Sequence, residues 1–175
     1  MITLQDYPFR SPIDLVDTIS DLIKNKIFCD IGCGCGDLLE YAITKDYTKN
    51  VIGLEQYKPF YDTAIENGRH YIKLVDVATK NAIPDADVYY IWTSKVLFET
   101  ISKALSPNKI LICGIDGGKC PFVVLPNYLT FLESRTFEYN ETRWSKKEYD
   151  GWPIVGKRTI WIYVTTNNES AIQKI

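Results

Sequence analysis

Short apolar runs alternate with amphipathic stretches through the first two thirds of the chain. The apolar runs are rich in β-branched and aromatic residues and lie at residues 26–31, 50–55, 70–75, 87–92 and 109–115. Between most of them, apolar residues recur every three or four positions, which is the period of a helix with one buried face. Strands that alternate with helices predict a mostly parallel sheet with helices on both faces.

Two segments depart from this alternation. Residues 11–24 predict a helix before the first strand, because Ser11 suits its cap and Pro12 its first turn. Residues 130–139 and 157–166 resemble two strands with no helix between them. Consecutive strands without a crossover helix pair antiparallel, so we expect these two at one edge of the sheet.

The composition is that of one soluble folded domain. The chain has 175 residues, 46% of them hydrophobic and 24% charged, with a net charge of −2. We therefore expect a single domain over residues 1–175, with its core at about 26–166. The sequence has neither a signal core nor a run of the roughly 20 apolar residues that span a bilayer, which predicts a cytoplasmic protein without a membrane partner. The charge balance argues against a protein whose whole surface binds nucleic acid.

The cysteines and the single histidine limit the chemistry. Cys29, Cys33 and Cys35 lie close together, but their spacing is one residue short of the C-x-x-x-C-x-x-C pattern that holds an iron–sulfur cluster. Zinc needs four ligands, and no matching pair lies nearby in the sequence. We therefore expect no metal site and interpret the cysteines of this segment as small side chains. A Cys–His or Ser–His hydrolase would have to use His70, the only histidine.

A glycine-rich turn follows the first predicted strand. Gly32, Gly34 and Gly36 let the backbone turn sharply and approach a ligand without a Cβ in the way. Ligands of parallel sheets bind at this carboxyl edge, beside the N–H groups of the following helix. A dinucleotide fingerprint would need its third glycine at position 37, where Asp37 stands. Asp30, at the strand end, favours a cationic ligand instead.

The pattern D-x-G-x-G-x-G over residues 30–36 resembles that of the class I S-adenosylmethionine-dependent methyltransferases. Two acids stand where that family has ligand contacts, Glu55 at the end of the second strand and Asp76 after the third. The resemblance covers residues 11–166 and implies S-adenosylmethionine as the cofactor. It also implies a doubly wound, seven-stranded Rossmann-like sheet with the order 3-2-1-4-5-7-6 and the seventh strand antiparallel.

The resemblance implies a role for each residue of the site. Asp30 and the three glycines would hold the methionine part of the cofactor, Glu55 the ribose hydroxyls and Asp76 the adenine amino group. Val77 and Tyr57 would lie beside the adenine ring. Each of these residues could instead have a purely structural role. The glycines could only form a tight turn, Glu55 could be a solvated acid, Asp76 could cap the following turn, and Val77 could pack in the core.

The acceptor is less well defined. Many amino-group methyltransferases carry an Asn/Asp-Pro-Pro-aromatic motif after the fourth strand, and this chain has Trp92-Thr93-Ser94 there. Base methylation of the common type is therefore disfavoured, and a protein, a nucleotide and a small molecule all stay open as acceptors. Trp92 is the candidate to border the methyl group, and Asp116, after the fifth strand, is the candidate acid that faces the acceptor.

Two other functions fit the same resemblance. A non-catalytic adenosyl-binding partner subunit fits the absent motif and the small size, and a spermidine-synthase-type aminopropyl transferase shares the fold. The connection at residues 141–157 carries Trp144, Tyr149 and Trp152 among charged residues. It predicts either a solvated hairpin or a surface for the acceptor or for a protein partner.

Overall fold

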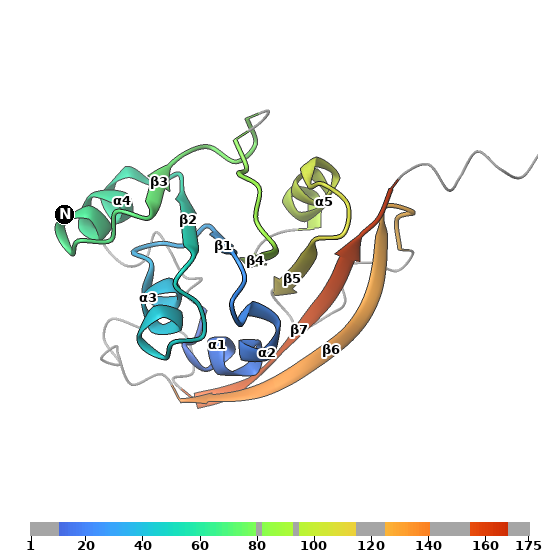
Figure 1. Cartoon of the computed structure of the whole chain (residues 1–175), viewed down its shortest axis with the longest axis horizontal. Helices are drawn as coiled ribbons and strands as arrows, with labels where there is room; N and C mark the ends of the chain where they lie inside the picture. Colours follow the sequence, from blue (N-terminus) through green and yellow to red (C-terminus); the bar gives the residue numbers. More distant parts are fainter. Residues whose placement is uncertain (1–10, 80–81, 93–94, 115–124, 141–154, 168–175) are drawn as a thin grey trace, which may run out of the picture.

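The computed structural model of the chain describes residues 11–79, 82–92, 95–114, 125–140 and 155–167. The strands in these ranges are β1 (Phe28–Ile31), β2 (Val51–Glu55), β3 (Ile72–Leu74), β4 (Val88–Trp92), β5 (Ile110–Gly114), β6 (Leu129–Asn140) and β7 (Val155–Thr165). The helices there are α1 (Asp14–Thr18), α2 (Ser20–Ile23), α3 (Asp37–Thr44), α4 (Lys58–Glu66) and α5 (Lys95–Ala104). Figure 1 shows how these elements are arranged around the sheet.

The strands form one seven-stranded sheet in the order β3-β2-β1-β4-β5-β7-β6. β1 pairs parallel with β2 and β4, β2 with β3, and β4 with β5. β7 is antiparallel to both β5 and β6. The predicted fold class and strand order are therefore confirmed. Because the chain leaves β1 in one direction along the sheet and β4 in the other, the carboxyl ends of these two strands form the switch point where such sheets bind ligands.

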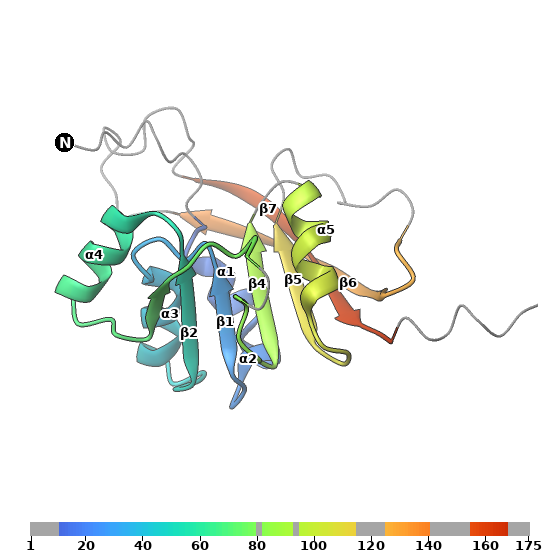
Figure 2. The ribbon, with the colours of Figure 1, turned by 90° about the horizontal axis from the view of Figure 1, so that it is seen from above.

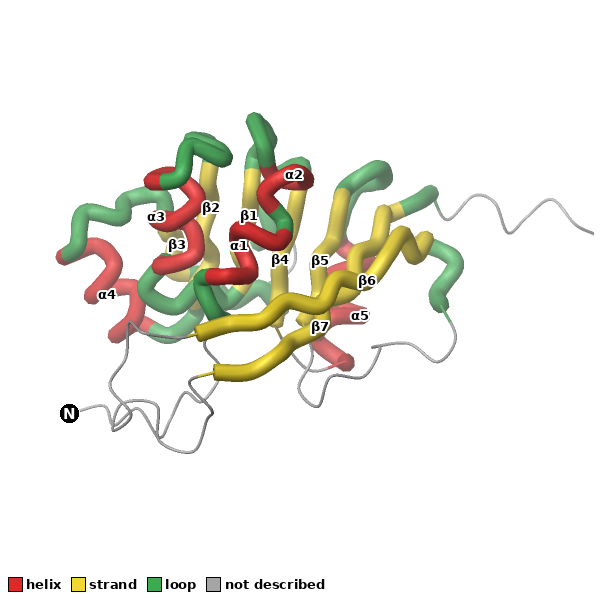
Figure 3. The backbone as a smooth tube through the Cα atoms, turned by 90° about the horizontal axis from the view of Figure 1, so that it is seen from below, coloured by secondary structure: helices red, strands yellow, loops and turns green. Residues whose placement is uncertain are grey.

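Helices cover both faces of the sheet, as Figures 2 and 3 show from opposite sides. On the face of α1, α2 and α3, the side chains of Ile19 and Leu39 are fully buried with Phe28 of β1. On the opposite face, Phe98 of α5 packs against Tyr163 of β7, with ring centroids 5.8 Å apart. No helix within the described ranges is long and apolar enough to cross a membrane.

The helix predicted at residues 11–24 is divided in two. α1 ends at Thr18 and α2 begins at Ser20, because Ile19 leaves the helical conformation with φ −109° and ψ 9°. The hydroxyls of Thr18 and Ser20 donate to the carbonyls of Asp14 and Asp17, at 3.0 and 2.9 Å. Such side-chain bonds compete with the backbone bonds of a continuous helix, which explains the break.

Ser11 does not cap this first helix. Ile13 occupies the N-cap position, without a side-chain hydrogen bond to the helix. Ser11 Oγ instead shares a hydrogen bond of 2.5 Å with Tyr90 Oη, so the start of the described chain is attached to β4 in the centre of the sheet.

β6 and β7 form a long hairpin that runs past α1 and α2 (Figures 1 and 3). Both strands are longer than the predicted segments at residues 130–139 and 157–166. A register shift between Phe131 and Glu133 marks a bulge, which bends a strand and increases its twist. Phe137, beyond the bulge, is buried in the same core as α1.

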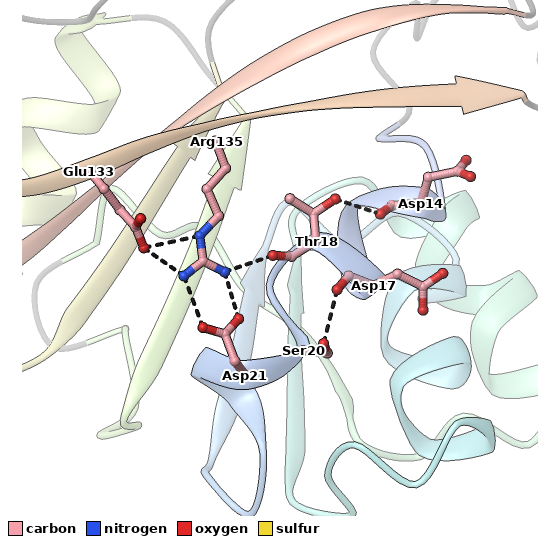
Figure 4. Close-up of polar contacts among 7 residues, drawn as sticks. All are labelled: Asp14, Asp17, Thr18, Ser20, Asp21, Glu133 and Arg135. Atoms are coloured by element: carbon pink, nitrogen blue, oxygen red, sulfur yellow. Dashed lines mark hydrogen bonds and ion pairs between the residues drawn. The ribbon is translucent and has the colours of Figure 1, made fainter.

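Arg135 fastens this hairpin to the first two helices (Figure 4). Its guanidinium donates to both carboxylate oxygens of Asp21, at 2.5 and 2.9 Å, and to the carbonyl of Thr18 at 2.7 Å. Glu133, on the same strand, accepts two further bonds at 3.0 and 2.5 Å. One side chain of β6 thus holds the ends of α1 and α2 together.

The third strand is shorter than its prediction. β3 spans only Ile72–Leu74, and His70 lies exposed in the turn before it. Gly68, with φ 78°, follows the last turn of α4, and the N–H of His70 donates to the Gly68 carbonyl at 3.1 Å. This turn occupies the residues that the apolar pattern had assigned to the strand.

Candidate functional site

The glycine turn lies at the carboxyl end of β1, in the centre of the sheet. Gly32, Gly34 and Gly36 all have positive φ, at 79°, 57° and 86°. The N–H groups of Gly32 and Cys33 donate to the carbonyl of Leu54 in β2, at 2.8 and 3.1 Å. Because side chains with a Cβ rarely adopt this conformation, the turn itself requires the alternating glycines.

The three glycines face different surroundings. A Cβ added at Gly36 would collide with the side chain of Ile72, so this glycine lets the start of α3 approach β3. A Cβ added at Gly32 or Gly34 would meet no atom of the described chain within 4 Å. The turn therefore leaves open space beside those two glycines, where a ligand could approach the backbone closely.

Glu55 supports this turn from the end of β2. The residue is 1% exposed, which excludes the solvated acid considered from the sequence. Its Oε2 accepts the N–H of Gly34 at 2.8 Å, and its Oε1 accepts the N–H of Tyr57 at 2.7 Å. These bonds use one lone pair of each oxygen and hold the carboxylate next to the open side of the turn.

Asp30 is the second buried acid of the site. It is 3% exposed and lies in register between Gly53 of β2 and Tyr90 of β4. Burial, and after it the negative charge of Glu55, raises the pKa of Asp30 to about 8. Near neutral pH this carboxyl is largely protonated, and a cation placed beside it would favour its ionised form.

Cys33 packs under the turn. Its Sγ lies so close to β2 that a Cβ added at Gly53 would come within 2.7 Å of it. Burial, with the charges of Asp30 and Glu55, raises the pKa of the thiol well above its ordinary value, so the side chain acts as a small apolar group. Among the residues that the structure describes, no group of three or more His, Cys, Asp or Glu side chains is placed to hold a metal ion.

Asp76 and Val77 follow β3 at the same edge of the sheet. The N–H of Val75 donates to the carbonyl of Glu55 at 2.8 Å, so this segment continues beside the end of β2. Asp76 is exposed, and its Oδ1 accepts the N–H of Ala78 at 2.9 Å, as a turn cap does. Val77 is half-buried and packs against the core on the face of α5. Contacts of these two residues with a ligand stay predictions.

Arg69 is a residue of this site that the sequence did not reveal. Its guanidinium donates to the carbonyl of Cys35 at 2.6 Å and to Oδ1 of Asp37 at 2.7 Å. The Arg69 side chain is only 17% exposed, so it holds the turn and the start of α3 from one side. Asp37, which disfavours a dinucleotide, is thus an ion-pair partner of a residue 32 positions away. No local pattern links the two.

A group of two aromatic rings and an arginine lies at the end of β4. The indole of Trp92 covers Gly114 of β5, where any Cβ would overlap the ring. The guanidinium of Arg158, from β7, lies over the indole at 4.6 Å from the ring centroid and 5.2 Å from that of Tyr139. The structure thus places Trp92 at the carboxyl end of the strand next to β1. It also shows Arg158 as a neighbour of Trp92, a pair that the sequence did not suggest.

Two parts of the predicted acceptor site lie outside the described residues. They are Asp116 and most of the connection, residues 141–154. Lys157, at the end of the predicted segment, belongs to β7 and pairs with Glu138 of β6 at 2.8 Å on the exposed side of the hairpin. The roles assigned to Asp116 and to the connection stay predictions.

Solved structures share this arrangement of strands and helices. The N-methyltransferase NodS from Bradyrhizobium japonicum matches with a TM-score of 0.62 over 89% of this chain and 94% of its own, at 12% identity. An RNA methyltransferase from Salinibacter ruber in complex with S-adenosylhomocysteine matches at 0.58 over 92% and 95%, at 17% identity. TrmN from Thermus thermophilus matches at 0.59 over 87% of this chain, which spans 48% of its length, at 11% identity. The chain has the class I methyltransferase fold.

The likeness to these methyltransferases is one of structure. The sequence matches no protein-family model and no curated protein. At 17% identity or less, the shared architecture establishes the fold and leaves the acceptor undetermined. Within this methyltransferase fold, the glycine turn and the two buried acids lie at the switch point of the sheet. The resemblance drawn from the motif at residues 30–36 is thus confirmed for the fold.

Proposed function

We propose that this chain is an S-adenosylmethionine-dependent methyltransferase. The observation that carries the proposal is the open space beside Gly32 and Gly34, which adjoins the buried carboxyls of Asp30 and Glu55. A ligand suited to this space approaches the backbone closely, carries a cationic group for Asp30 and offers hydroxyls to Glu55. S-adenosylmethionine has an ammonium, a sulfonium and a ribose diol, and when bound it supplies a methyl group that a lone pair of the acceptor displaces from sulfur.

Each side chain of the site has a defined task under this proposal. Asp30 is ionised by the cationic end of the ligand and attracts it. Glu55 has a second lone pair on each oxygen, so it can accept two ribose hydroxyls while it still holds the turn. Because Glu55 is only 1% exposed, the part of the site that would hold the ribose must open as the ligand enters. Asp76 has an oxygen besides the one that Ala78 uses, which suits the adenine amino group, with Val77 beside the ring.

The end of β4 is the place where the acceptor would meet the methyl group. Displacement at carbon needs the acceptor atom aligned with the breaking bond and stripped of water. Trp92 is the last residue of β4, the strand next to β1, and Tyr90, two residues earlier on the same face, is buried in the core. The half-buried indole of Trp92 offers an apolar surface there. A protein side chain, a nucleotide and a small molecule all fit this description of the acceptor.

Calorimetry with S-adenosylhomocysteine and with NAD tests the cofactor. We expect one molecule of S-adenosylhomocysteine to bind per chain, because its ammonium and ribose suit Asp30 and Glu55. NAD should not bind, because its pyrophosphate would face two buried acids. Tight binding of NAD, or no binding of S-adenosylhomocysteine, would contradict the proposal.

Methyl transfer itself needs a second measurement. The protein is incubated with S-adenosylmethionine labelled in its methyl group and with pools of RNA, proteins and small metabolites, which are then examined by mass spectrometry. Appearance of label in one pool identifies the acceptor class. Binding of S-adenosylhomocysteine without transfer to any pool would favour the non-catalytic partner subunit. A parallel incubation with decarboxylated S-adenosylmethionine and a polyamine tests the third alternative, which transfer of the aminopropyl group would favour.

A further inference from the structure

Two side chains of opposite charge hold the backbone of the glycine turn. The carboxylate of Glu55 accepts the N–H of Gly34 at 2.8 Å. The guanidinium of Arg69 donates to the carbonyl of Cys35 at 2.6 Å. Glu55 is 1% exposed and the Arg69 side chain 17%, so water weakens neither bond fully. Because hydrogen bonds to charged groups are about twice as strong as those between neutral groups, the turn is held firmly at two points.

The two contacts are the ends of one chain of hydrogen bonds through the turn. The carboxylate binds the peptide group that joins Cys33 to Gly34. The guanidinium binds the peptide group that joins Cys35 to Gly36. The N–H of Gly36 donates to the carbonyl of Cys33 at 2.9 Å, so these two peptide groups are bonded to each other. Each bond polarises the next in the same direction, and loss of the guanidinium should therefore loosen the turn as far as Gly34.

The charge of Arg69, which lies between α4 and β3, is balanced inside the protein. Its guanidinium donates to Oδ1 of Asp37 at 2.7 Å, and its Nε lies 3.8 Å from a carboxylate oxygen of Glu40. Its aliphatic stem lies beside Gly36, where an added Cβ would come within 3.5 Å of the Arg69 Cδ. A Cβ added at Gly34 would meet no described atom within 4 Å. An effect of Arg69 on a ligand beside Gly34 would therefore pass through the turn.

We propose that Arg69 is a positioning residue for the cofactor, which fixes the conformation of Gly34 through the carbonyl of Cys35; this inference rests on the proposed function. Glycine has the widest choice of backbone conformations, so a turn of alternating glycines keeps a single one only when other groups hold it. A site that is ordered before the ligand arrives loses less entropy on binding. Without Arg69 the ligand must order the turn itself, and its affinity falls.

A purely structural Arg69 would instead stabilise the fold and leave the affinity of the folded protein unchanged. A comparison of Arg69→Met with Tyr71→Phe separates the two roles. Tyr71 Oη donates to Oε2 of Glu40 at 2.8 Å, so it also joins the segment before β3 to α3. Each variant removes hydrogen bonds between these two elements, and only Arg69→Met removes the bond to the turn. Arg69→Lys is the conservative variant, because its ammonium can still donate to a carbonyl.

Calorimetry with S-adenosylhomocysteine measures the affinity of each folded variant. We expect Arg69→Met to weaken binding at least about tenfold, Arg69→Lys to weaken it less, and Tyr71→Phe to bind as the wild type does. Amide hydrogen exchange without ligand measures the order of the turn. In Arg69→Met the N–H groups of Gly34 and Gly36 should exchange faster, and by a larger factor than those of β4, which report unfolding of the whole domain.

The outcomes distinguish this inference from the proposed function. If S-adenosylhomocysteine binds to Arg69→Met as tightly as to the wild type, or if Tyr71→Phe weakens binding as much, the inference is wrong and the proposed function stands. If the wild type does not bind S-adenosylhomocysteine, the proposed function is wrong and the positioning role falls with it.

A measurement on the wild type serves if Arg69→Met does not fold. The N–H groups of Gly34 and Gly36 should be protected from exchange before any ligand is added, because each already donates within the structure. Rapid exchange of both groups in the free protein, with protection only after S-adenosylhomocysteine is added, would mean that Arg69 does not order the turn in advance.

Discussion

Asp30 couples ligand binding to protons. Its pKa is raised to about 8 by burial and by Glu55, whereas an ionised carboxylate suits a cationic ligand. Binding of such a ligand below about pH 8 must therefore release a proton from Asp30. Without a ligand, the stability of the folded chain changes with pH in the opposite direction. The contribution of Asp30 to stability is greatest below the pKa that Asp30 has in the unfolded chain, and it is lost as the pH rises through about 8, its pKa in the folded chain.

The first prediction follows from this coupling. The affinity for S-adenosylhomocysteine should increase between pH 6 and pH 8, by up to about tenfold per pH unit, and should level off above that range. Asp30→Asn should bind more weakly and lose the pH dependence. Calorimetry in two buffers of different ionisation enthalpy counts the released protons. An affinity independent of pH in the wild type would mean that Asp30 does not change its charge on binding.

Gly34 supports a prediction with a matched control. Gly34→Ala and Gly68→Ala each place a Cβ at positive φ with no atom of the described chain within 4 Å. They differ in position, because Gly34 lies in the turn after β1 and Gly68 follows α4. Both variants should lose about 1 kcal/mol of stability from the backbone conformation. Only Gly34→Ala should also lose binding of S-adenosylhomocysteine, as calorimetry would show. Equal binding by both variants would place the ligand elsewhere.

The residues that sequence reasoning found differ in kind from those that it missed. The glycines, Asp30 and Glu55 are recognisable because each stands at a fixed distance from the end of a strand. Arg69 and Arg158 act on partners far away in the chain, Asp37 and Trp92, and such pairs become neighbours only when the strands assemble. The glycine turn was therefore predictable from the sequence, whereas the contacts of Arg69 with the turn and of Arg158 with Trp92 were not.

At the scale of elements, the attachment of the hairpin to α1 and α2 depends on Arg135. Arg135→Met removes the bidentate contact with Asp21 and the bond to the Thr18 carbonyl. Because both charged groups are partly exposed and screened, we expect a loss of about 1 kcal/mol in the free energy of unfolding. Denaturant unfolding measures it, and Asp21→Asn combined with Arg135→Met should lose less than the sum of the two.

Lys157→Gln is the control for that cycle. It removes a cation from the same hairpin, but its pair with Glu138 is exposed on both sides, so the stability should not change. Additive losses for Arg135 and Asp21 would show that the contact in Figure 4 does not stabilise the fold.

The boundaries of elements were harder to predict than their order. The single helix expected at residues 11–24 is broken at Ile19, because hydroxyls on both sides bond to the backbone. The stripe of apolar residues is still buried, since α1 and α2 lie on the same face of the sheet. Periodicity thus reports which residues are covered, whereas local hydrogen bonds decide where a helix ends.

The whole sheet was predictable because its connections leave few alternatives. Helices between successive strands require parallel pairing, and the helix-free step between the last two strands requires an antiparallel pair. The exact order of the strands came from the resemblance of the motif at residues 30–36. The crossing of the β6–β7 hairpin past α1 had no counterpart in the sequence pattern, since it depends on packing between segments more than a hundred positions apart.

At the scale of the whole molecule, the site and the core are parts of one structure. The glycine turn connects β1 with α3, Glu55 ends β2, and the buried clusters on the two faces share the central strands. The single domain predicted for the chain should therefore unfold in one thermal transition, and a ligand bound at the turn should shift the whole transition.

S-adenosylhomocysteine at about 100 times its dissociation constant should add about 2.7 kcal/mol to the free energy of unfolding, which raises Tm by about 5–10 °C. Scanning calorimetry with NAD at the same concentration, and with Gly34→Ala, should show no shift. Two separate transitions, or a shift confined to one of them, would mean that the strands holding the site fold independently of the rest.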